Sequence, residues 1–224
     1  MLEQEDGSKN NNYLKFYLLS LVVIIVDQSV KLVIYHTMDL GTGGQIQIFD
    51  DWFKLHYTLN PGMAFGITLG SEYGKLALTL FRLVAMVGIG YYLYKLSQSR
   101  VHPGLLWCVG LILGGAIGNV IDSTLYGVLL DNAPYNASTP WFHGQVIDMF
   151  YIDIWEGRMA NWIPFLGGQH IALWPIFNVA DASIFVGVII ILIWQKKFFD
   201  FNKEKSKDNK DIQDISGEVA DITN

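Results

Sequence analysis

Charged residues are scarce in this sequence. Asp, Glu, Lys and Arg together make up 16% of its 224 residues, whereas an ordinary soluble domain carries about a quarter. Hydrophobic residues make up 51%, and the mean hydropathy is positive. The net charge of −6 reflects acids that crowd the two tails, and there is no broad basic surface. The composition therefore favours a membrane protein and excludes a nucleic-acid-binding protein.

Cysteine is nearly absent as well. The single Cys108 lies in an apolar run, which excludes an internal disulfide and a Cys-x-x-Cys metal site, and we interpret it as a small core residue. The five histidines are scattered, and neither a His-Glu-x-x-His pattern nor a clustered His and Cys set occurs. We therefore expect no metal ligands and no cofactor.

Long apolar runs, in contrast, are plentiful. A helix of roughly 20 residues crosses a hydrocarbon core of about 30 Å. Four stretches reach that length, at about 13–35, 75–96, 103–121 and 172–194. The first is too long for a cleaved signal peptide, and it contains charged residues. The sequence therefore predicts an all-α membrane protein with four transmembrane helices.

The four stretches define one membrane domain over residues 13–201. Its two long loops cover about 36–74 and 122–171. Residues 1–12 form a polar N-terminal tail. Residues 202–224 are polar and mixed in charge, so we expect a disordered C-terminal tail.

Basic residues indicate the orientation of the domain. Lys95 and Arg100 lie between the second and third stretches, and a run of lysines begins at Lys196. The two long loops have only Lys54 and Arg158 clear of the span ends. The positive-inside rule therefore predicts cytoplasmic termini and long loops on the outer side.

The long loops carry structural signals of their own. Residues 45–49 and 52–57 alternate as strands do, which predicts a small outer β-cradle that residues 63–67 could extend. The second loop is rich in aromatic residues that suit a cap at headgroup level. Its tryptophans are Trp141, Trp155, Trp162 and Trp174.

Polar residues inside the apolar stretches give the strongest functional signal. An ionisable residue at membrane depth is costly and is a functional hypothesis by default. Asn119 and Asp122 are three residues apart, as are Asn178 and Asp181, so each pair shares a helix face. From the predicted span, Asp181 lies about nine residues, or roughly 13 Å, below the outer end of its helix. Asp27 is expected in the same outer layer.

Asp148 belongs to this layer too. It lies in an apolar segment, Gln145–Phe150, that we expect to return to the membrane surface. The sequence therefore predicts that carboxylates and carboxamides from several segments converge in the outer half of the bilayer.

Simpler interpretations exist for some of these residues. Asp27 and Lys31 are four apart and could neutralise each other, and Asp122 could cap a helix end. Gly110, Gly114 and Gly118 recur every four residues on the third stretch, which predicts close helix packing without chemistry.

Five segments, in order, resemble the motifs of lipoprotein signal peptidase, or signal peptidase II, an aspartyl endopeptidase of bacterial membranes. They are Val26–Lys31, Asn60–Gly66, Gly114–Asp122, Val146–Met149 and Phe177–Asp181. The family fold, four helices with an outer β-cradle and a further outer loop, agrees with the predicted organisation.

The resemblance implies that Asp148 and Asp181 form a catalytic pair in the bacterial inner membrane. The substrate would be a prolipoprotein with diacylglycerol on its cysteine, cut just before that cysteine. We expect a monomer in contact with membrane lipids. The residues implied to support or line the site are Asp27, Asn60, Asn119, Asp122 and Asn178.

Three features depart from the family pattern. Ser123 stands where an arginine is usual, so a cation near the carboxylates is missing. Residues 123–147 are longer than the usual spacer, which predicts an enlarged second outer loop. Met149 replaces a usual phenylalanine.

A different class of function is also compatible with buried carboxylates. A proton- or ion-coupled transporter places such groups in its helices, but four helices without an inverted repeat or broken helix pair argue against it. A presenilin-type protease requires a Gly-x-Gly-Asp motif, which the sequence lacks.

Overall fold

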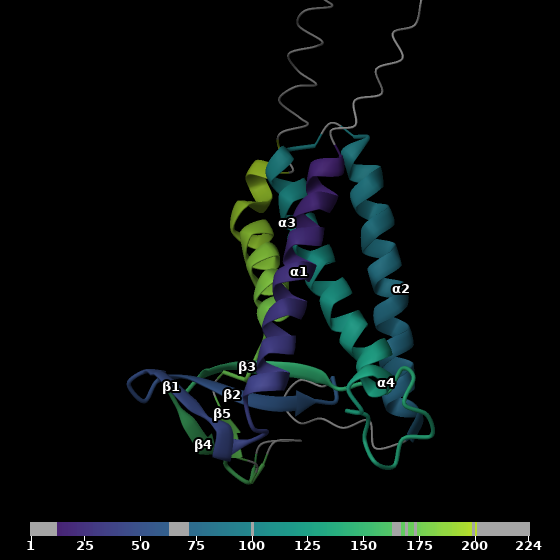
Figure 1. The fold of residues 1–224 in the computed structure, drawn as a ribbon. Helices are drawn as coiled ribbons and strands as arrows, with labels where there is room; N and C mark the ends of the chain where they lie inside the picture. The colour runs from purple at the N-terminus through teal and green to yellow at the C-terminus, as the bar shows by residue number, and fades with distance from the viewer. Residues whose placement is uncertain are drawn as a thin grey trace, which may run out of the picture.

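Four long helices stand side by side, and a small β-sheet lies across one end of the bundle (Figure 1). The computed structural model describes residues 13–62, 72–99, 101–162, 167, 168, 170–172, 174–198 and 200. Both predicted tails and the proposed strand extension at 63–67 lie outside these residues. The helices are α1 (Leu14–Thr37), α2 (Glu72–Ser97), α3 (Pro103–Ile121) and a C-terminal helix (Val179–Phe198). Each is long and apolar enough to cross a membrane.

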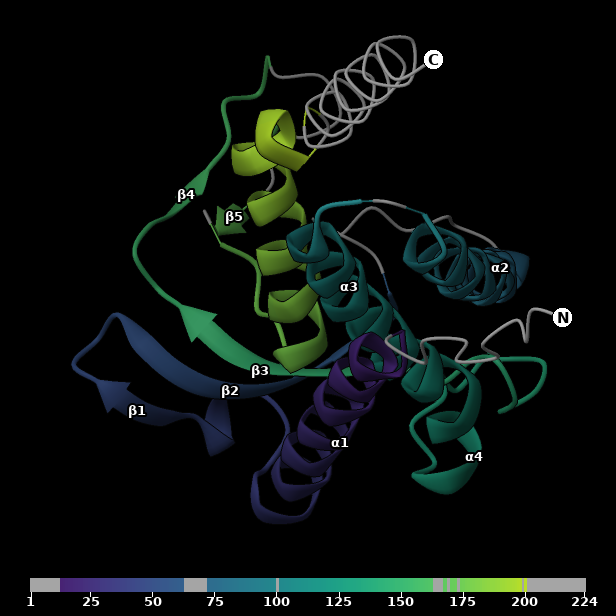
Figure 2. The ribbon, with the colours of Figure 1, turned by 90° about the horizontal axis from the view of Figure 1, so that it is seen from above.

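Helix α3 is the centre of the bundle. Viewed along the bundle, it lies between α1, α2 and the C-terminal helix (Figure 2). In its most apolar window 61% of the residues are buried, against 11% in α2 and in the C-terminal helix. The outer helices instead expose large apolar side chains, such as Leu18, Val84 and Ile193, which suits a lipid environment.

The glycine stripe of α3 packs against α1, as predicted. A Cβ atom at Gly110 would lie 2.9 Å from the carbonyl oxygen of Phe16, and one at Gly114 would lie 2.8 Å from the Cβ of Val23. Only glycine permits this approach of the two backbones. The stripe thereby brings the polar end of α3 against α1.

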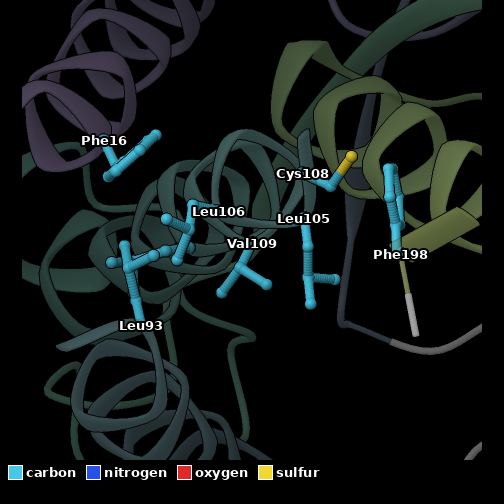
Figure 3. Packing of buried hydrophobic residues seen from close by; sticks show 8 residues of the cluster. Phe16, Leu93, Leu105, Leu106, Cys108, Val109 and Phe198 are labelled. Atoms are coloured by element: carbon cyan, nitrogen blue, oxygen red, sulfur yellow. The ribbon is translucent and has the colours of Figure 1, made fainter. Parts of the chain in front are cut away.

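An apolar cluster holds the bundle together at the end opposite the sheet (Figure 3). Its members come from all four helices and include Cys108, which is a buried core residue, as predicted. His102 caps the start of α3 by accepting a hydrogen bond from the Gly104 amide (3.0 Å). The buried members are Phe16, Leu93, Leu105, Leu106, Cys108, Val109, Leu113 and Phe198.

The β-cradle joins the two long loops. Strands β1 (Ile46–Phe49) and β2 (Phe53–Asn60) come from the first loop, and β3 (Val146–Ile152) comes from the second. They form an antiparallel sheet in the order β1-β2-β3. A second sheet pairs β4 (Glu156–Arg158) with β5 (His170–Ala172).

The predicted cradle is therefore confirmed, and Asp148 lies on one of its strands. Asp148 is opposite Thr58, whereas two residues further along β3, Phe150 is opposite Leu55. The extra residue of β2 between these pairs is a bulge that bends the strand.

The predicted third stretch coincides with α3, whereas the predicted start of the fourth is wrong. The third span continues beyond residue 121 as a π-helix (η2, Asp122–Tyr126) and a final turn (α4, Gly127–Leu129). The fourth begins at Val179 rather than 172, because Phe177 exchanges backbone hydrogen bonds with Phe150 of β3. The second long loop thus runs from about 130 to 178 rather than from 122 to 171.

Candidate active site

All the predicted site residues meet where the helix bundle joins the sheet. Asp27 lies on α1, Asn60 on β2 and Asp148 on β3. Asn119 and Asp122 lie at the sheet end of α3, and Asn178 and Asp181 at the start of the C-terminal helix. One connected set of hydrogen bonds and ion pairs includes every one of them.

Asn178 and Asp181 cap the C-terminal helix reciprocally. The Asn178 Oδ1 accepts from the Asp181 amide (2.9 Å), and the Asp181 Oδ2 accepts from the Asn178 amide (3.4 Å). This is the geometry of a capping box, in which two amides without helical partners are satisfied at once. Asp181 therefore lies in the first turn of its helix, and the expected depth of nine residues is wrong.

The same asparagine contacts Asp148. Its Nδ2 donates to Asp148 Oδ1 (2.6 Å), and Asn60 Nδ2 donates to Asp148 Oδ2 (2.9 Å). Asn119 Nδ2 donates to Asp181 Oδ1 (2.8 Å). Three carboxamides thus orient the two carboxylates, and Asn178 contacts both.

Asp148 is in an environment that favours its protonated form. Its exposed fraction is 1%, and burial raises its pKa to about 7, with the negative charge of Asp181 acting in the same direction. The hydrogen bonds from Asn60 and Asn178 and the charge of Lys31 oppose this shift. Burial and the neighbouring carboxylate therefore outweigh the groups that favour the ionised form of Asp148.

A buried lysine lies next to the carboxamides. Lys31 Nζ is 2.8 Å from Asp27 Oδ2 and 2.8 Å from Asp122 Oδ2, and all three side chains are fully buried. It also donates to Asn119 Oδ1 (3.1 Å). The pair between Asp27 and Lys31 exists, but it is part of a larger network, since Asp27 Oδ1 also accepts from the Ala180 amide (2.9 Å).

Asp122 is more than a helix cap. It begins the π-helix, a wider turn that often occurs at functional sites. Its carboxylate accepts from Gln28 Nε2 (2.9 Å) and from the Ile147 amide (3.3 Å). It thereby links α1, α3 and β3.

The contacts of three polar residues in this region, Gln28, Arg82 and Tyr126, were not predicted. The Tyr126 hydroxyl donates to Gln28 Oε1 (2.8 Å), which fixes the amide that contacts Asp122. Arg82 of α2 donates to Ser123 Oγ (2.9 Å) and to the Gly62 carbonyl (3.0 Å). A lone arginine inside an apolar span is a signal that could have identified this residue. Among the described residues, no cluster of His, Cys, Asp and Glu side chains is suited to hold a metal ion.

Comparisons with known proteins agree on one family. The sequence model described as signal peptidase (SPase) II matches residues 19–197. The lipoprotein signal peptidase of Amoebophilus asiaticus is 49% identical over 180 residues, covering 80% of this chain and 76% of the relative. That of Porphyromonas gingivalis is 42% identical over 186 residues, covering 78% and 80%.

Solved structures point the same way. A structure titled as a bacterial membrane enzyme at 2.3 Å resolution has a TM-score of 0.53 and 26% identity, and the match covers 82% of this chain and 88% of that one. A second such structure, at 1.9 Å resolution, has a TM-score of 0.52, 25% identity, and 80% and 90% coverage. On this evidence the chain is a membrane protease that belongs to the signal peptidase II family.

Proposed function

We propose that this protein is an aspartyl endopeptidase of the bacterial inner membrane that removes signal peptides from diacylglyceryl-modified prolipoproteins, cutting before the lipidated cysteine. The relatives named lipoprotein signal peptidase support the substrate class. The observation that carries the catalytic assignment is the position of Asn178, whose side chain donates to the Asp148 carboxylate and whose backbone amide donates to the Asp181 carboxylate. Membership of a peptidase family does not favour the transporter alternative.

The two carboxyl groups divide the acid and base roles. The pair holds one proton, so one carboxylate is ionised and removes a proton from a water molecule. The water oxygen forms a bond to the scissile carbonyl carbon, while the protonated carboxyl donates a hydrogen bond to the carbonyl oxygen. As the C–N bond breaks, a proton passes to the leaving amine, which is the amino group of the lipidated cysteine. Because the two groups titrate together, the shared proton belongs to the pair.

The remaining polar residues hold this pair in place. Asn60, Asn119 and Asn178 orient the carboxylate oxygens by hydrogen bonds. Asp27 and Asp122, with Lys31 between them, tie α1 and α3 together beside the pair. Asn60, near the end of its strand, is our candidate for a polar contact to the glyceryl linkage of the substrate.

The arrangement suits a substrate embedded in the outer half of the bilayer. Lys95 lies near the end of α2 remote from the sheet, and Lys196 lies near the corresponding end of the C-terminal helix (Figure 1). With that end in the cytoplasm, the carboxylates lie near the outer surface. We propose that the protein acts there as a monomer surrounded by membrane lipids.

A cleavage assay in proteoliposomes tests the function. Two lipobox peptides of one sequence, with and without diacylglycerol on the cysteine, are compared at equal membrane loading. We expect the lipidated peptide to be cut far faster, because recognition lies near the modified cysteine and not only in partitioning to the bilayer. Equal rates would instead indicate a general intramembrane aspartyl protease.

Single substitutions test the catalytic pair. Asp148→Asn and Asp181→Asn each remove a carboxylate with little change in volume, and each should lower turnover by at least about a hundredfold. Asp153→Asn is the matched control, because Asp153 follows β3 but pairs with Lys54 (2.6 Å) outside the network. Near-normal cleavage by Asp148→Asn together with a dead Asp122→Asn would move the pair to Asp122 and Asp181.

A further inference from the structure

Arg82 has an unusual position for a charged residue. It lies about three turns into α2. The nearby side chains of Phe81 and Val84 on the same helix are apolar and exposed. A guanidinium at such a depth is costly unless it is paired. Arg82 reaches two acceptors on different elements, since Nη1 donates to Ser123 Oγ of η2 and Nη2 donates to the Gly62 carbonyl after β2.

One arm of the guanidinium leads to Asp148. The Gly62 amide donates to Asn60 Oδ1 (2.7 Å), and Asn60 Nδ2 donates to Asp148 Oδ2 (2.9 Å). Holding the Gly62 carbonyl therefore fixes the turn that orients Asn60. In the closed turn, the Asn60 side chain is held at both its oxygen and its nitrogen.

The other arm leads to Asp181. The Ser123 hydroxyl donates to the Asn119 carbonyl (2.9 Å), and the side chain of Asn119 donates to Asp181 Oδ1 (2.8 Å). Arg82 is thus the one described side chain of α2 with hydrogen bonds toward both carboxylate supports.

The turn at Gly62 is shaped to admit the guanidinium. Its φ of +96° lies in the region that favours glycine. A Cβ atom there would lie 2.8 Å from Arg82 Nη1, so any other residue would displace the guanidinium. Backbone conformation and free space therefore coincide at the position where Arg82 binds.

The charge of Arg82 also matters. It interacts electrostatically with Asp181, Asp122 and Asp148, whereas Lys31 is already paired with two carboxylates. Position 123, where an arginine was expected and serine is found, is the residue that Arg82 touches. A cation is thus present at this place, but it comes from a different helix.

We infer that Arg82 is a positioning residue of the proteolytic reaction, which holds Asn60 and Asn119 in register and supplies from α2 the positive charge that residue 123 lacks. This inference rests on the proposed function. Arg82 acts through the asparagines and touches neither carboxylate through a hydrogen bond that would make it a catalytic group.

Moving the guanidinium provides the test. We expect Arg82→Gln to lower kcat by about tenfold to a hundredfold, as displaced catalytic groups do, with KM for the lipidated lipobox peptide changed less than about threefold. The alkaline limb of the pH profile should move to higher pH, because a nearby cation favours ionised carboxylates. The double variant Arg82→Gln/Ser123→Arg should recover at least about half of the lost activity, on a logarithmic scale, and the original pH limb.

Two further variants test whether the lost activity reflects a general loss of structure. Lys95→Gln removes an exposed cation from the same helix and should leave turnover within about twofold. Arg82→Lys keeps the charge but lacks the fork that reaches two acceptors, so it should fall between wild type and Arg82→Gln. Wild-type turnover in Arg82→Gln, or a double variant no better than the single one, would overturn the inference.

Hydrogen exchange tests the inference independently of activity. The Gly62 amide is held by Asn60, so deuterium uptake over residues 58–62 should be faster in Arg82→Gln and slow again in the double variant. Unchanged uptake in Arg82→Gln would count against the role of Arg82. Failure of the wild type to cut the lipidated peptide would instead contradict the proposed function, while the exchange result still decides the role of Arg82.

Discussion

Two buried lysines in this protein have opposite surroundings. Lys31 is fully buried between Asp27 and Asp122, each 2.8 Å from its Nζ. Lys75, near the start of α2, is 9% exposed, and its Nζ has no hydrogen-bond partner among the described residues. A buried charge costs free energy unless it is paired, so the two residues should respond differently to neutral substitution.

We predict that Lys31→Met lowers the free energy of unfolding by roughly 3–5 kcal/mol, because it leaves two buried carboxylates without their cation. Lys75→Met should leave stability unchanged or raise it, because it removes a buried amine that no described residue pairs with and keeps a similar side-chain volume. Thermal unfolding of both variants in the same lipid nanodiscs measures the difference. Equal destabilisation by the two would show that the ion pairs of Lys31 contribute nothing beyond side-chain packing.

On the proposed mechanism, Asp148 gives the reaction a pH dependence. Its pKa is raised to about 7, so the shared proton is lost as the pH rises through that value, and we predict that turnover falls above about pH 7. The contribution of Asp148 to the free energy of unfolding changes in the same direction. It is complete below the pKa of about 3.9 that an aspartate has in the unfolded chain, and it is lost as the pH rises through about 7. The pH–rate profile for the lipidated peptide measures the alkaline limb.

Asn60 supplies the internal control for that limb. Its hydrogen bond opposes the upward shift of the Asp148 pKa. Asn60→Ala should therefore move the alkaline limb to higher pH, whereas Asp153→Asn should leave it in place. A downward movement in Asn60→Ala would assign the limb to another group.

At the scale of elements, helix capping explains why the apolar pattern misplaces the start of the last helix. Asn178 and Asp181 were interpreted as polar residues in a helix interior because the preceding residues are apolar. Their spacing of three is also that of a capping box, and the hydrogen bonds between them mark the start of the helix. The helices α1, α2 and α3 were predicted within a few residues, because long apolar runs bounded by polar loops leave little ambiguity.

The strand that carries Asp148 could not be predicted from alternation in the sequence either. Residues 146–149 are all buried, so β3 lacks the alternation that identified β1 and β2. The convergence of Asp27, Asp122 and Asp148 was predictable from their expected depth. The contacts of Gln28 and Arg82 were not, because these depend on which face of each helix meets α3.

The glycines of α3 allow a matched prediction. A Cβ atom at Gly118 would lie 2.5 Å from Asp27 Oδ2, so Gly118→Ala should displace that carboxylate and cost about 1–3 kcal/mol. Gly88 of α2 has nothing within 4 Å of such an atom, and Gly88→Ala should stabilise its helix by up to about 1 kcal/mol. Unfolding midpoints of the two variants give the comparison, and equal midpoints would contradict the predicted close packing.

At the scale of the whole molecule, the ends of the bundle differ in chemistry. The sheet, α4 and the start of the C-terminal helix lie at one end (Figure 1), and the exposed Trp141 and Trp155 are on the segments that follow α4 and β3. The opposite ends of α2 and of the C-terminal helix carry Lys95 and Lys196. Aromatic residues suit the headgroup region and lysines suit the cytoplasmic side. The orientation follows from this asymmetry as a prediction.

We predict that cysteine introduced at Ser138 is labelled from outside intact cells, whereas cysteine at Ser99 is not. Both positions are exposed, and Cys108→Ala provides the background without other thiols. An impermeant maleimide applied before and after permeabilisation measures the two. Labelling of position 99 in sealed cells would indicate the reverse orientation, with the carboxylates near the cytoplasm.

The order of the network along the chain has a consequence for membrane insertion. Asp27 and Lys31 leave the ribosome long before Asp122, which lies on the third helix, and before Asp181, which lies on the last. During this interval α1 carries both charges into the bilayer, and their i, i+4 ion pair neutralises them without help from any other segment. When α3 arrives, Lys31 gains its second carboxylate. On the proposed catalytic assignment, a nascent chain therefore lacks a complete pair of carboxylates, and we expect it to have no proteolytic activity, until its final helix has been released from the translocon.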